Sequence, residues 1–248
     1  MVRLFRSRRA RKWAIGVAAA LVLVLVAGFV LLRVASSRTF QFFGEIVDRV
    51  DTADRVVALT FDDGPDPAGT QSLLDTLAAR GVPATFFLIG RELATHPELG
   101  RAIAGAGHEI GNHSFSHERM IGVTPAWVAD EVEATDALIR ATGYRGEIQF
   151  RPPNGKKLFA LPHYLAEHQR KTITWDVEPN SDPEVDRSAA AIARYTAEHV
   201  RPGSIVVLHA MYASREQTRA ALGPMIDQLR QNGYRFVTVS QLLAEGRR

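Results

Sequence analysis

The 248-residue chain contains no cysteine, and its first 40 residues contain no aspartate or glutamate. The first absence excludes disulfide bonds, a thiol nucleophile and a thiolate metal site. The second absence leaves eight of the 30 Lys and Arg side chains in a segment that has no acidic residue. The rest of the chain carries 22 basic against 27 acidic side chains, although the formal net charge of the whole is +3. This mildly acidic remainder argues against nucleic acid as a partner.

An uncharged run of twenty residues, Trp13 to Leu32, follows the basic N-terminus. At about 1.5 Å per residue, a helix of this length spans roughly 30 Å, one hydrocarbon core. Six Lys and Arg residues precede it, so the positive-inside rule predicts a cytoplasmic N-terminus and an exported remainder. A cleaved signal peptide is the alternative, for which Val34-Ala35-Ser36 offers a poor cleavage site. We predict a single-pass anchor in a bacterial inner (cytoplasmic) membrane, with the globular part outside the cytoplasm.

After residue 54, short β-rich runs alternate with helix-like stretches. The first run is Val56–Phe61, and the stretch that follows has apolar residues at Leu73, Leu74 and Leu77. Strands that alternate with helices indicate a parallel α/β architecture. About seven repeats suit a distorted (β/α) barrel, preceded by one transmembrane helix, better than an open sheet. The expected strands are 56–61, 84–89, 108–111, 148–150, 172–176, 204–208 and 235–239, and the expected helices are 70–79, 97–106, 125–141, 158–168, 186–200 and 215–232.

The pattern divides the chain into five parts. They are a basic cytoplasmic tail (1–12), a transmembrane signal-anchor helix (13–33), a linker (34–54), a globular domain (55–242) and a C-terminal tail (243–248). In parallel α/β folds, functional residues lie at the carboxyl ends of strands. Polar residues follow five of the expected strands, at Asp62, His113, Arg151, Asp176 and His209.

Two of these positions carry paired groups. Asp62 and Asp63 end the first strand, and neighbouring side chains there point in different directions, so one can bind a metal while the other faces a substrate. His113 and His117 are spaced i and i+4, which puts both imidazoles on one face of a helical turn. With a carboxylate they form a His2Asp set that leaves metal positions open, as in hydrolytic zinc sites. Taken singly, each pair also fits a solvated turn or a chance spacing of histidines.

Two further runs carry polar residues after strands. Residues 151–155 (Arg-Pro-Pro-Asn-Gly) combine a stiff backbone with a turn, which can aim a backbone N–H at a developing oxyanion. The apolar run Ile205–Leu208 ends in His209, which can act as a general acid beside a metal and a leaving amine. A structural loop and a structural histidine are the alternatives.

In chain order, these four runs resemble the motifs of the polysaccharide deacetylase family (NodB homology domain, carbohydrate esterase family 4). Thr-Phe-Asp-Asp-Gly-Pro at 60–65 and His-Ser-x-x-His at 113–117 are the most specific part of the likeness. The resemblance covers residues 55–242, including a closing segment, 233–240, that looks like the family's last strand. It implies a hydrolase that removes N-acetyl groups from a chitooligosaccharide-, peptidoglycan- or exopolysaccharide-type glycan and releases acetate.

The resemblance also implies a role for each motif residue. Asp62 would be the general base, and His209 would protonate the departing amine. A divalent metal, Zn²⁺ before Co²⁺ or another ion, would be held by Asp63, His113 and His117. The remaining implied roles are the oxyanion donor (Asn154 N–H), the acetyl-pocket wall (Leu208), the holder of the base (Arg151) and the buttress of that arginine (Glu178).

Two positions depart from the family pattern. Asn154 stands where the family often has an aromatic residue, so the backbone donor is kept and a stacking surface for the sugar is lost. The fourth motif, residues 175–183, lacks its terminal Trp, and we prefer Glu178 over Asp182 as the buttress. These changes leave the glycan unidentified. They keep two alternatives open, an O-acetyl esterase on the same scaffold and a catalytically silent glycan-binding envelope protein.

Overall fold

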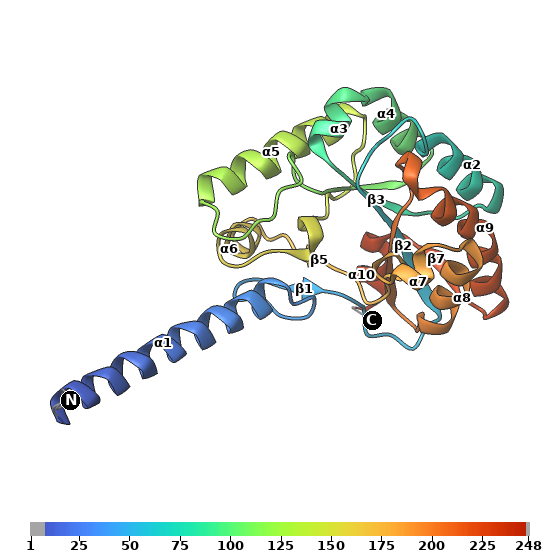
Figure 1. The fold of residues 1–248 in the computed structure, drawn as a ribbon. Helices are drawn as coiled ribbons and strands as arrows, with labels where there is room; N and C mark the ends of the chain where they lie inside the picture. Colours follow the sequence, from blue (N-terminus) through green and yellow to red (C-terminus); the bar gives the residue numbers. More distant parts are fainter. Residues whose placement is uncertain (1–7, 247–248) are drawn as a thin grey trace.

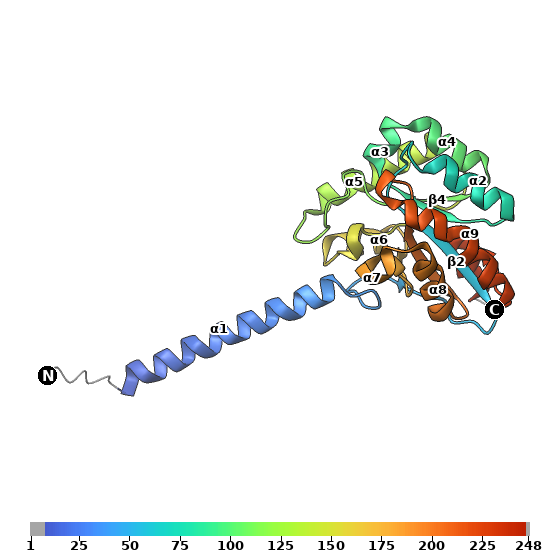
Figure 2. The same cartoon turned by 45° about the vertical axis from the view of Figure 1, so that its right-hand side comes forward.

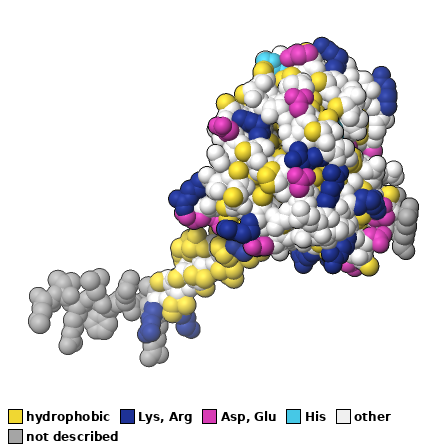
Figure 3. Space-filling model, turned by 90° about the vertical axis from the view of Figure 1, so that its right-hand side faces the viewer, with side chains coloured by type: hydrophobic (Ala, Val, Ile, Leu, Met, Phe, Trp, Pro, Cys, Tyr) yellow, Lys and Arg dark blue, Asp and Glu magenta, His cyan; other side chains and the backbone are white. Residues whose placement is uncertain are grey.

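A long helix stands out from a rounded α/β body in the computed structural model, which describes residues 8–246 (Figures 1 and 2). The outer parts of the predicted tails, residues 1–7 and 247–248, lie outside the described residues. Helix α1 (Arg8–Ala35) has 28 residues and is about 42 Å long. The window Arg11–Ala35 is long and apolar enough to cross a membrane, and its most apolar part is not buried in the body. Figure 3 shows hydrophobic side chains along this helix.

Strand β2 (Val56–Asp62) is the centre of a five-stranded parallel sheet. It pairs with β3 (Thr85–Leu88), β6 (Ser204–His209) and β7 (Arg235–Val237), and β4 (Glu109–Asn112) pairs with β3. Every residue of β2 is buried. The strand is a near-continuous apolar run because both faces of a parallel sheet are covered.

Alternate side chains of β2 enter two different cores. Val57, Leu59 and Phe61 pack into a core shared with helices α2 (Thr70–Arg80), α4 (Pro97–Gly105) and α9 (Glu216–Gln231). Val56 and Ala58 pack into a second core that contains residues of β5, β6, β7 and α10. Since side chains along a strand alternate between its faces, Asp62 lies on the same side as Val56 and Ala58.

Helices surround the sheet, and local caps define several of their ends. Thr124 caps α5 by accepting a hydrogen bond from the Trp127 N–H, and Thr238 and Gln241 form a capping box at α10. The predicted helices are confirmed to within a few residues, 186–200 being found as α8, whereas α3, α7 and α10 were not predicted. The helices after α1 are α2 (Thr70–Arg80), α3 (Gly90–Thr95), α4 (Pro97–Gly105), α5 (Pro125–Ala141), α6 (Ala160–Glu167), α7 (Pro183–Asp186), α8 (Ala189–His199), α9 (Glu216–Gln231) and α10 (Val239–Glu245).

The predicted seven-stranded barrel is confirmed only as a parallel α/β fold. Within residues 8–246, regular pairing gives the five-stranded sheet and a separate pair, β1 (Ile46–Val47) with β5 (Thr172–Ile173). The expected strand 148–150 is reduced to Phe150, which forms single bridges to Asn112 and Thr172. Two prolines follow Phe150 closely, and proline has no N–H with which to extend a ladder.

Residues 34–54, predicted as a linker, pack onto the body. Ala35 at the end of α1 is fully buried. Farther along, β1 pairs in parallel with β5, and Val47 and Val50 join the second core. Figure 1 accordingly shows β1 lying between the end of α1 and the sheet.

Candidate active site

The carboxyl ends of the parallel strands meet beside one cavity. Asp62 at the end of β2 is in register with His209 at the end of β6. A cavity of about 510 Å³ lies at this edge of the sheet. Seven of the nine predicted site residues line it, namely Asp62, Asp63, His113, His117, Asn154, Glu178 and His209.

The three predicted metal ligands come together. One ligand atom from each of Asp63, His113 and His117 lies within 4.8 Å of the others. His117 Nε2 is 3.2 Å and His113 Nε2 is 3.8 Å from Asp63 Oδ1. The expected helical turn is wrong, because residues 113–117 form a loop after β4. Ser114 and His117 have φ values of 64° and 61°, and this left-handed backbone turns the loop so that the two imidazoles face each other.

The surroundings of the trio suit a divalent cation. His113 Nδ1 is 2.8 Å from the Arg151 carbonyl oxygen, so its N–H donates there and Nε2 keeps its lone pair toward Asp63. Burial lowers the pKa of His113, which favours the neutral, ligating form. Burial raises the pKa of Asp63, but the hydrogen bond with His117 and the nearby histidines outweigh it and bring it to about 2. Asp63 Oδ1 is also buried without a well-aligned hydrogen bond within the described chain, as expected of an oxygen that binds metal.

The predicted base is held by a buried arginine. Arg151 Nη1 donates to Asp62 Oδ1 at 2.6 Å and to Thr60 Oγ1 at 2.7 Å, and Nη2 donates to the Thr174 carbonyl at 3.0 Å. Arg151 is 0% exposed. Burial lowers its pKa, and the charge of Asp62 opposes that shift. The ion pair therefore fixes one oxygen of Asp62 and leaves Oδ2, 3.7 Å from His113 Nε2, on the side of the metal ligands.

Replacing Arg151 by Met is expected to destabilise the protein strongly. The substitution leaves Asp62 as an uncompensated buried charge, and breaking such a pair costs about 3–5 kcal/mol. Thermal unfolding of the full chain in detergent, followed by circular dichroism, measures the loss. The double variant Arg151→Met with Asp62→Leu should recover part of it, since both charges are then removed. A single variant as stable as the wild type would contradict this account of the pair.

Asn180 positions the second predicted proton-transfer group. Its Oδ1 accepts the His209 backbone N–H at 3.0 Å, and its Nδ2 donates to Asp186 and Thr218. Asn180 lies in the altered fourth motif, at 3-10 helix η2 (Pro179–Ser181). His209 Nδ1 is buried and unpaired among the described atoms. The altered motif thus holds the backbone of His209, a residue that lines the cavity.

Replacing Asn180 by Ala is expected to lower kcat by about 10- to 100-fold, because a small displacement of a reacting group has effects of that size. Metal affinity should not change, since Asn180 contacts none of the three ligands. Asn180→Asp keeps the acceptor oxygen but sets a second carboxylate against Asp186, so it is combined with Asp186→Asn, which returns an amide donor to that contact, and this double variant should retain more activity than Asn180→Ala. Steady-state kinetics with a zinc titration of each variant separates the two effects, and equal losses in both variants would refute the positioning role.

Leu208 and Glu178 have surroundings different from those expected, whereas Asn154 does not. Leu208 is fully buried and does not line the cavity. Asn154 lines the cavity with φ of 54°, and its backbone N–H has no acceptor within residues 8–246. Glu178 is not a hydrogen-bond partner of Arg151 in the described structure. Its Oε2 accepts from Trp175 Nε1 at 2.9 Å and lies 3.4 Å from the guanidinium of Arg38, so these two groups draw the carboxylate away.

Other residues at the cavity were not singled out from the sequence. Ser36, Arg38, Arg119 and Arg215 line it, and the first two come from the predicted linker. No local pattern marks them, because their approach to the cavity is made by contacts across the fold. Asp176, which follows a predicted strand, has a structural role instead, since it accepts hydrogen bonds from Ser204 Oγ and the Ile205 N–H.

These observations define a class of site. Two imidazoles and a carboxylate can hold a cation with open positions, and a second carboxylate and a third histidine stand beside them. Such a set at the strand ends of an α/β fold is typical of metal-dependent hydrolases that use no covalent nucleophile.

Comparisons with known proteins identify the family. Residues 49–173 match the family described as polysaccharide deacetylase. The chain is 33% identical over 204 residues to a peptidoglycan-N-acetylglucosamine deacetylase of Bacillus cereus, covering 81% of this chain and 93% of that protein. It is 35% identical over 202 residues to a chitooligosaccharide deacetylase of Bradyrhizobium, covering 76% and 90%. The chain belongs to the polysaccharide deacetylase family and is a deacetylase.

Two solved structures place the fold in the same family. The Bc1960 peptidoglycan N-acetylglucosamine deacetylase is similar with a TM-score of 0.74 and 31% identity, covering 79% of this chain and 91% of that one. A carbohydrate esterase family 4 pseudoenzyme from Bacillus anthracis is similar with a TM-score of 0.70 and 27% identity, covering 80% and 69%. Since the same fold occurs in a pseudoenzyme, the residues at the cavity carry the argument for catalysis.

Proposed function

We propose that this deacetylase removes N-acetyl groups from a cell-envelope glycan of the chitooligosaccharide, peptidoglycan or exopolysaccharide type. The supporting observation is the position of Asp62 between two partners. Arg151 holds one of its oxygens at 2.6 Å, while the other lies 3.7 Å from a metal-ligating imidazole. A carboxylate placed in this way is available to take a proton from water beside a bound cation.

The proposed reaction converts an acetamide and water into acetate and an amine. A divalent ion, which we propose to be Zn²⁺ held by Asp63, His113 and His117, supplies Lewis-acid polarisation of the acetyl carbonyl and of water. Asp62 accepts the proton of the attacking water, and Arg151 keeps that carboxylate in place and anionic. The Asn154 N–H donates to the oxyanion of the tetrahedral intermediate. His209 then donates a proton to the nitrogen as the C–N bond breaks. Asp62 afterwards releases its proton to solvent and His209 takes one up, which restores both groups and completes the balance.

The alternative of a silent glycan-binding protein rests on the altered fourth motif and on the existence of a pseudoenzyme with this fold. Against it, the metal ligands, the base with its arginine and the late histidine are all present at the cavity. The altered fourth motif also contacts the site, since Asn180 accepts a hydrogen bond from the His209 backbone N–H. We therefore favour the active enzyme.

Acetate release tests the proposal. The full chain, purified in detergent and loaded with Zn²⁺, is incubated with chitooligosaccharides, peptidoglycan and acetylxylan, before and after treatment with a chelator. Metal-dependent acetate from the first two substrates supports N-deacetylation, whereas release from acetylxylan alone supports the O-acetyl esterase. No metal-dependent acetate from any of them would favour the binding protein.

We further propose that α1 is an uncleaved anchor in the inner membrane, with the domain at 55–242 outside the cytoplasm. The supporting features are the length and exposure of the apolar helix and the basic residues before it. A C-terminal alkaline phosphatase fusion should be active in a bacterial host, and the fusion should stay with the membrane fraction. An inactive fusion contradicts export, and a soluble, shortened product contradicts the uncleaved anchor.

A further inference from the structure

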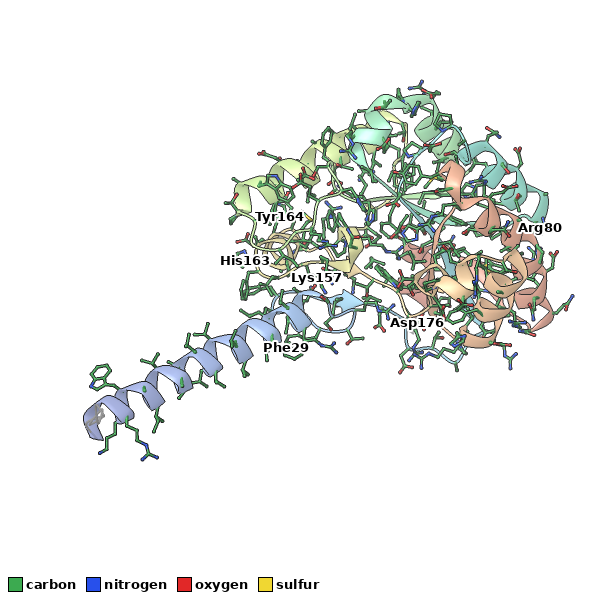
Figure 4. The ribbon with its side chains drawn as sticks, viewed as in Figure 1. Phe29, Arg80, Lys157, His163, Tyr164 and Asp176 are labelled. Carbon is green, nitrogen blue, oxygen red and sulfur yellow. The ribbon has the colours of Figure 1, made fainter. Side chains whose placement is uncertain are left out.

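The segment that follows α1, residues 36–38, is fixed against the catalytic domain. The Lys157 N–H donates to the Ala35 carbonyl at 3.1 Å, and the Lys157 ammonium donates to the Ser37 carbonyl. Lys157 lies close to the end of α1 in Figure 4. The Thr174 hydroxyl donates to the Arg38 carbonyl at 2.7 Å. These contacts satisfy carbonyls at and just after the helix end, and they hold the segment in one place.

The same segment forms part of the active-site cavity. Ser36 and Arg38 line the cavity that also contains the three metal ligands. The guanidinium of Arg38 lies 3.4 Å from Glu178 and 5.8 Å from the ring of Trp175. The Arg38 side chain is 45% exposed, so it is positioned by these neighbours and still accessible to a ligand. The Lys156 ammonium donates to Ser36 Oγ at 2.5 Å and lies on the same side.

The cavity gathers positive charge, although the globular part as a whole is mildly acidic. The rim cations are Arg38, Arg119, Lys156 and Arg215. Lys156 and Arg119 have no carboxylate within 4.0 Å in the described part of the chain. The carboxylates that line the cavity are already engaged, since Asp62 pairs with buried Arg151, Asp63 faces the metal position and Glu178 pairs with Arg38. A bound divalent cation would add further positive charge.

We propose that the segment 36–38 forms one wall of the substrate cleft and that Arg38, together with Lys156, binds an anionic group on the glycan near the acetylated sugar. The ligand chemistry is a carboxylate on a neighbouring sugar or a phosphate at the end of the glycan. An arginine fork matches either group, and the lysine adds a point charge beside it. The inference rests on the proposed function and names the substrate class for that site.

A purely structural role for Arg38 would have different consequences. In that case its pairing with Glu178 would fasten the segment, and its loss would affect all substrates alike. A binding role changes KM for anionic substrates selectively and makes the preference sensitive to salt, because exposed charges are screened. The two roles are therefore separated by substrate charge.

The test uses the full chain in detergent, loaded with Zn²⁺, and three substrates of equal length. They are a neutral N-acetylglucosamine tetrasaccharide, an oligosaccharide in which alternate sugars carry a carboxylate, and the neutral tetrasaccharide with a terminal phosphate. The wild type should prefer at least one anionic substrate, and 0.5 M salt should reduce that preference. Arg38→Gln should raise KM for that substrate about tenfold relative to KM for the neutral one, without a matching change in kcat. Whichever of the two anionic substrates the wild type prefers shows whether the bound group is a carboxylate or a phosphate.

Arg33→Gln is the matched control, because Arg33 is an exposed cation in the last turn of α1 that does not line the cavity. It should keep the wild-type preference. The proposal is overturned if the wild type does not prefer an anionic substrate, or if Arg38→Gln affects all three equally. If none of the three substrates yields zinc-dependent acetate, the proposed function fails instead. Calorimetric titration then measures the affinity of the same glycans for Asp62→Asn and for the double variant Asp62→Asn with Arg38→Gln. A weaker affinity of the double variant for the anionic glycans alone shows that Arg38 binds the anion, and equal affinities show that it does not.

Discussion

Replacing Asp62 by Asn is expected to lower turnover by about 10³- to 10⁴-fold while the protein still binds its metal. Asparagine keeps the shape of the side chain and an oxygen for the Arg151 hydrogen bond, but it cannot accept the proton of the attacking water. Metal affinity should be kept because the three ligands lie on other side chains. Rates of acetate release and a zinc titration of the same preparation measure the two properties separately.

The control for this substitution is Asp75→Asn, the same change at an exposed position of α2. It should leave turnover at the wild-type level. Asp62→Asn also leaves Arg151 without a counter-charge, so thermal unfolding must be measured to show that the variant is folded at the assay temperature. Near-wild-type rates in folded Asp62→Asn would mean that another group is the base.

Replacing His113 by Ala is expected to weaken zinc binding by at least about 100-fold and to abolish turnover. Loss of a supporting contact to a metal ligand already costs 10- to 100-fold in affinity, and here a ligand itself is removed. His113 is also the most buried of the three ligands. Competition with a chromophoric chelator measures the affinity.

A second readout of His113→Ala does not depend on activity. Ligand that binds only the folded state raises its stability by about 4 kcal/mol at a thousandfold excess over Kd. Zinc should therefore raise the unfolding temperature of the wild type and not that of the variant. His163→Ala, an exposed histidine paired with Glu167, is the control and should respond like the wild type. A zinc-dependent shift that survives in His113→Ala would place the metal elsewhere.

Where the sequence carries a local signal, the predictions agree with the structure. Helix α5 was expected at 125–141 and is found there, because Thr124 caps it, Pro125 opens it and its buried side chains follow helical spacing. The apolar runs that became β2 and β6 were found for the same reason. Their register places Asp62 opposite His209, so the order of strand ends alone was enough to bring these two residues together.

Where contacts are made between distant parts of the chain, the sequence was not sufficient. The i and i+4 spacing of His113 and His117 predicted that the two imidazoles lie together, but on a helical turn and not on the loop that is found. No sequence pattern predicts the left-handed backbone that turns this loop. Arg38 contacts Glu178, which is 140 positions away in the sequence. Residues 34–54, which include Arg38, have no periodicity and were therefore predicted to be a linker. Glu178 was assigned to Arg151 by analogy, whereas the indole of Trp175 competes for its carboxylate.

The junction between α1 and the body has a consequence for how the enzyme searches for substrate. A flexible tether of 20 residues would let a catalytic domain sample a radius of about 25 Å. Here Ala35 is buried and Lys157 fastens the next residues, so the helix and the domain turn together. If α1 is anchored in a bilayer as proposed, this junction would hold the cleft at a constant height above the lipid surface. Distance from that surface would then select which acetyl groups are reached, and glycan strands lying farther out would be spared.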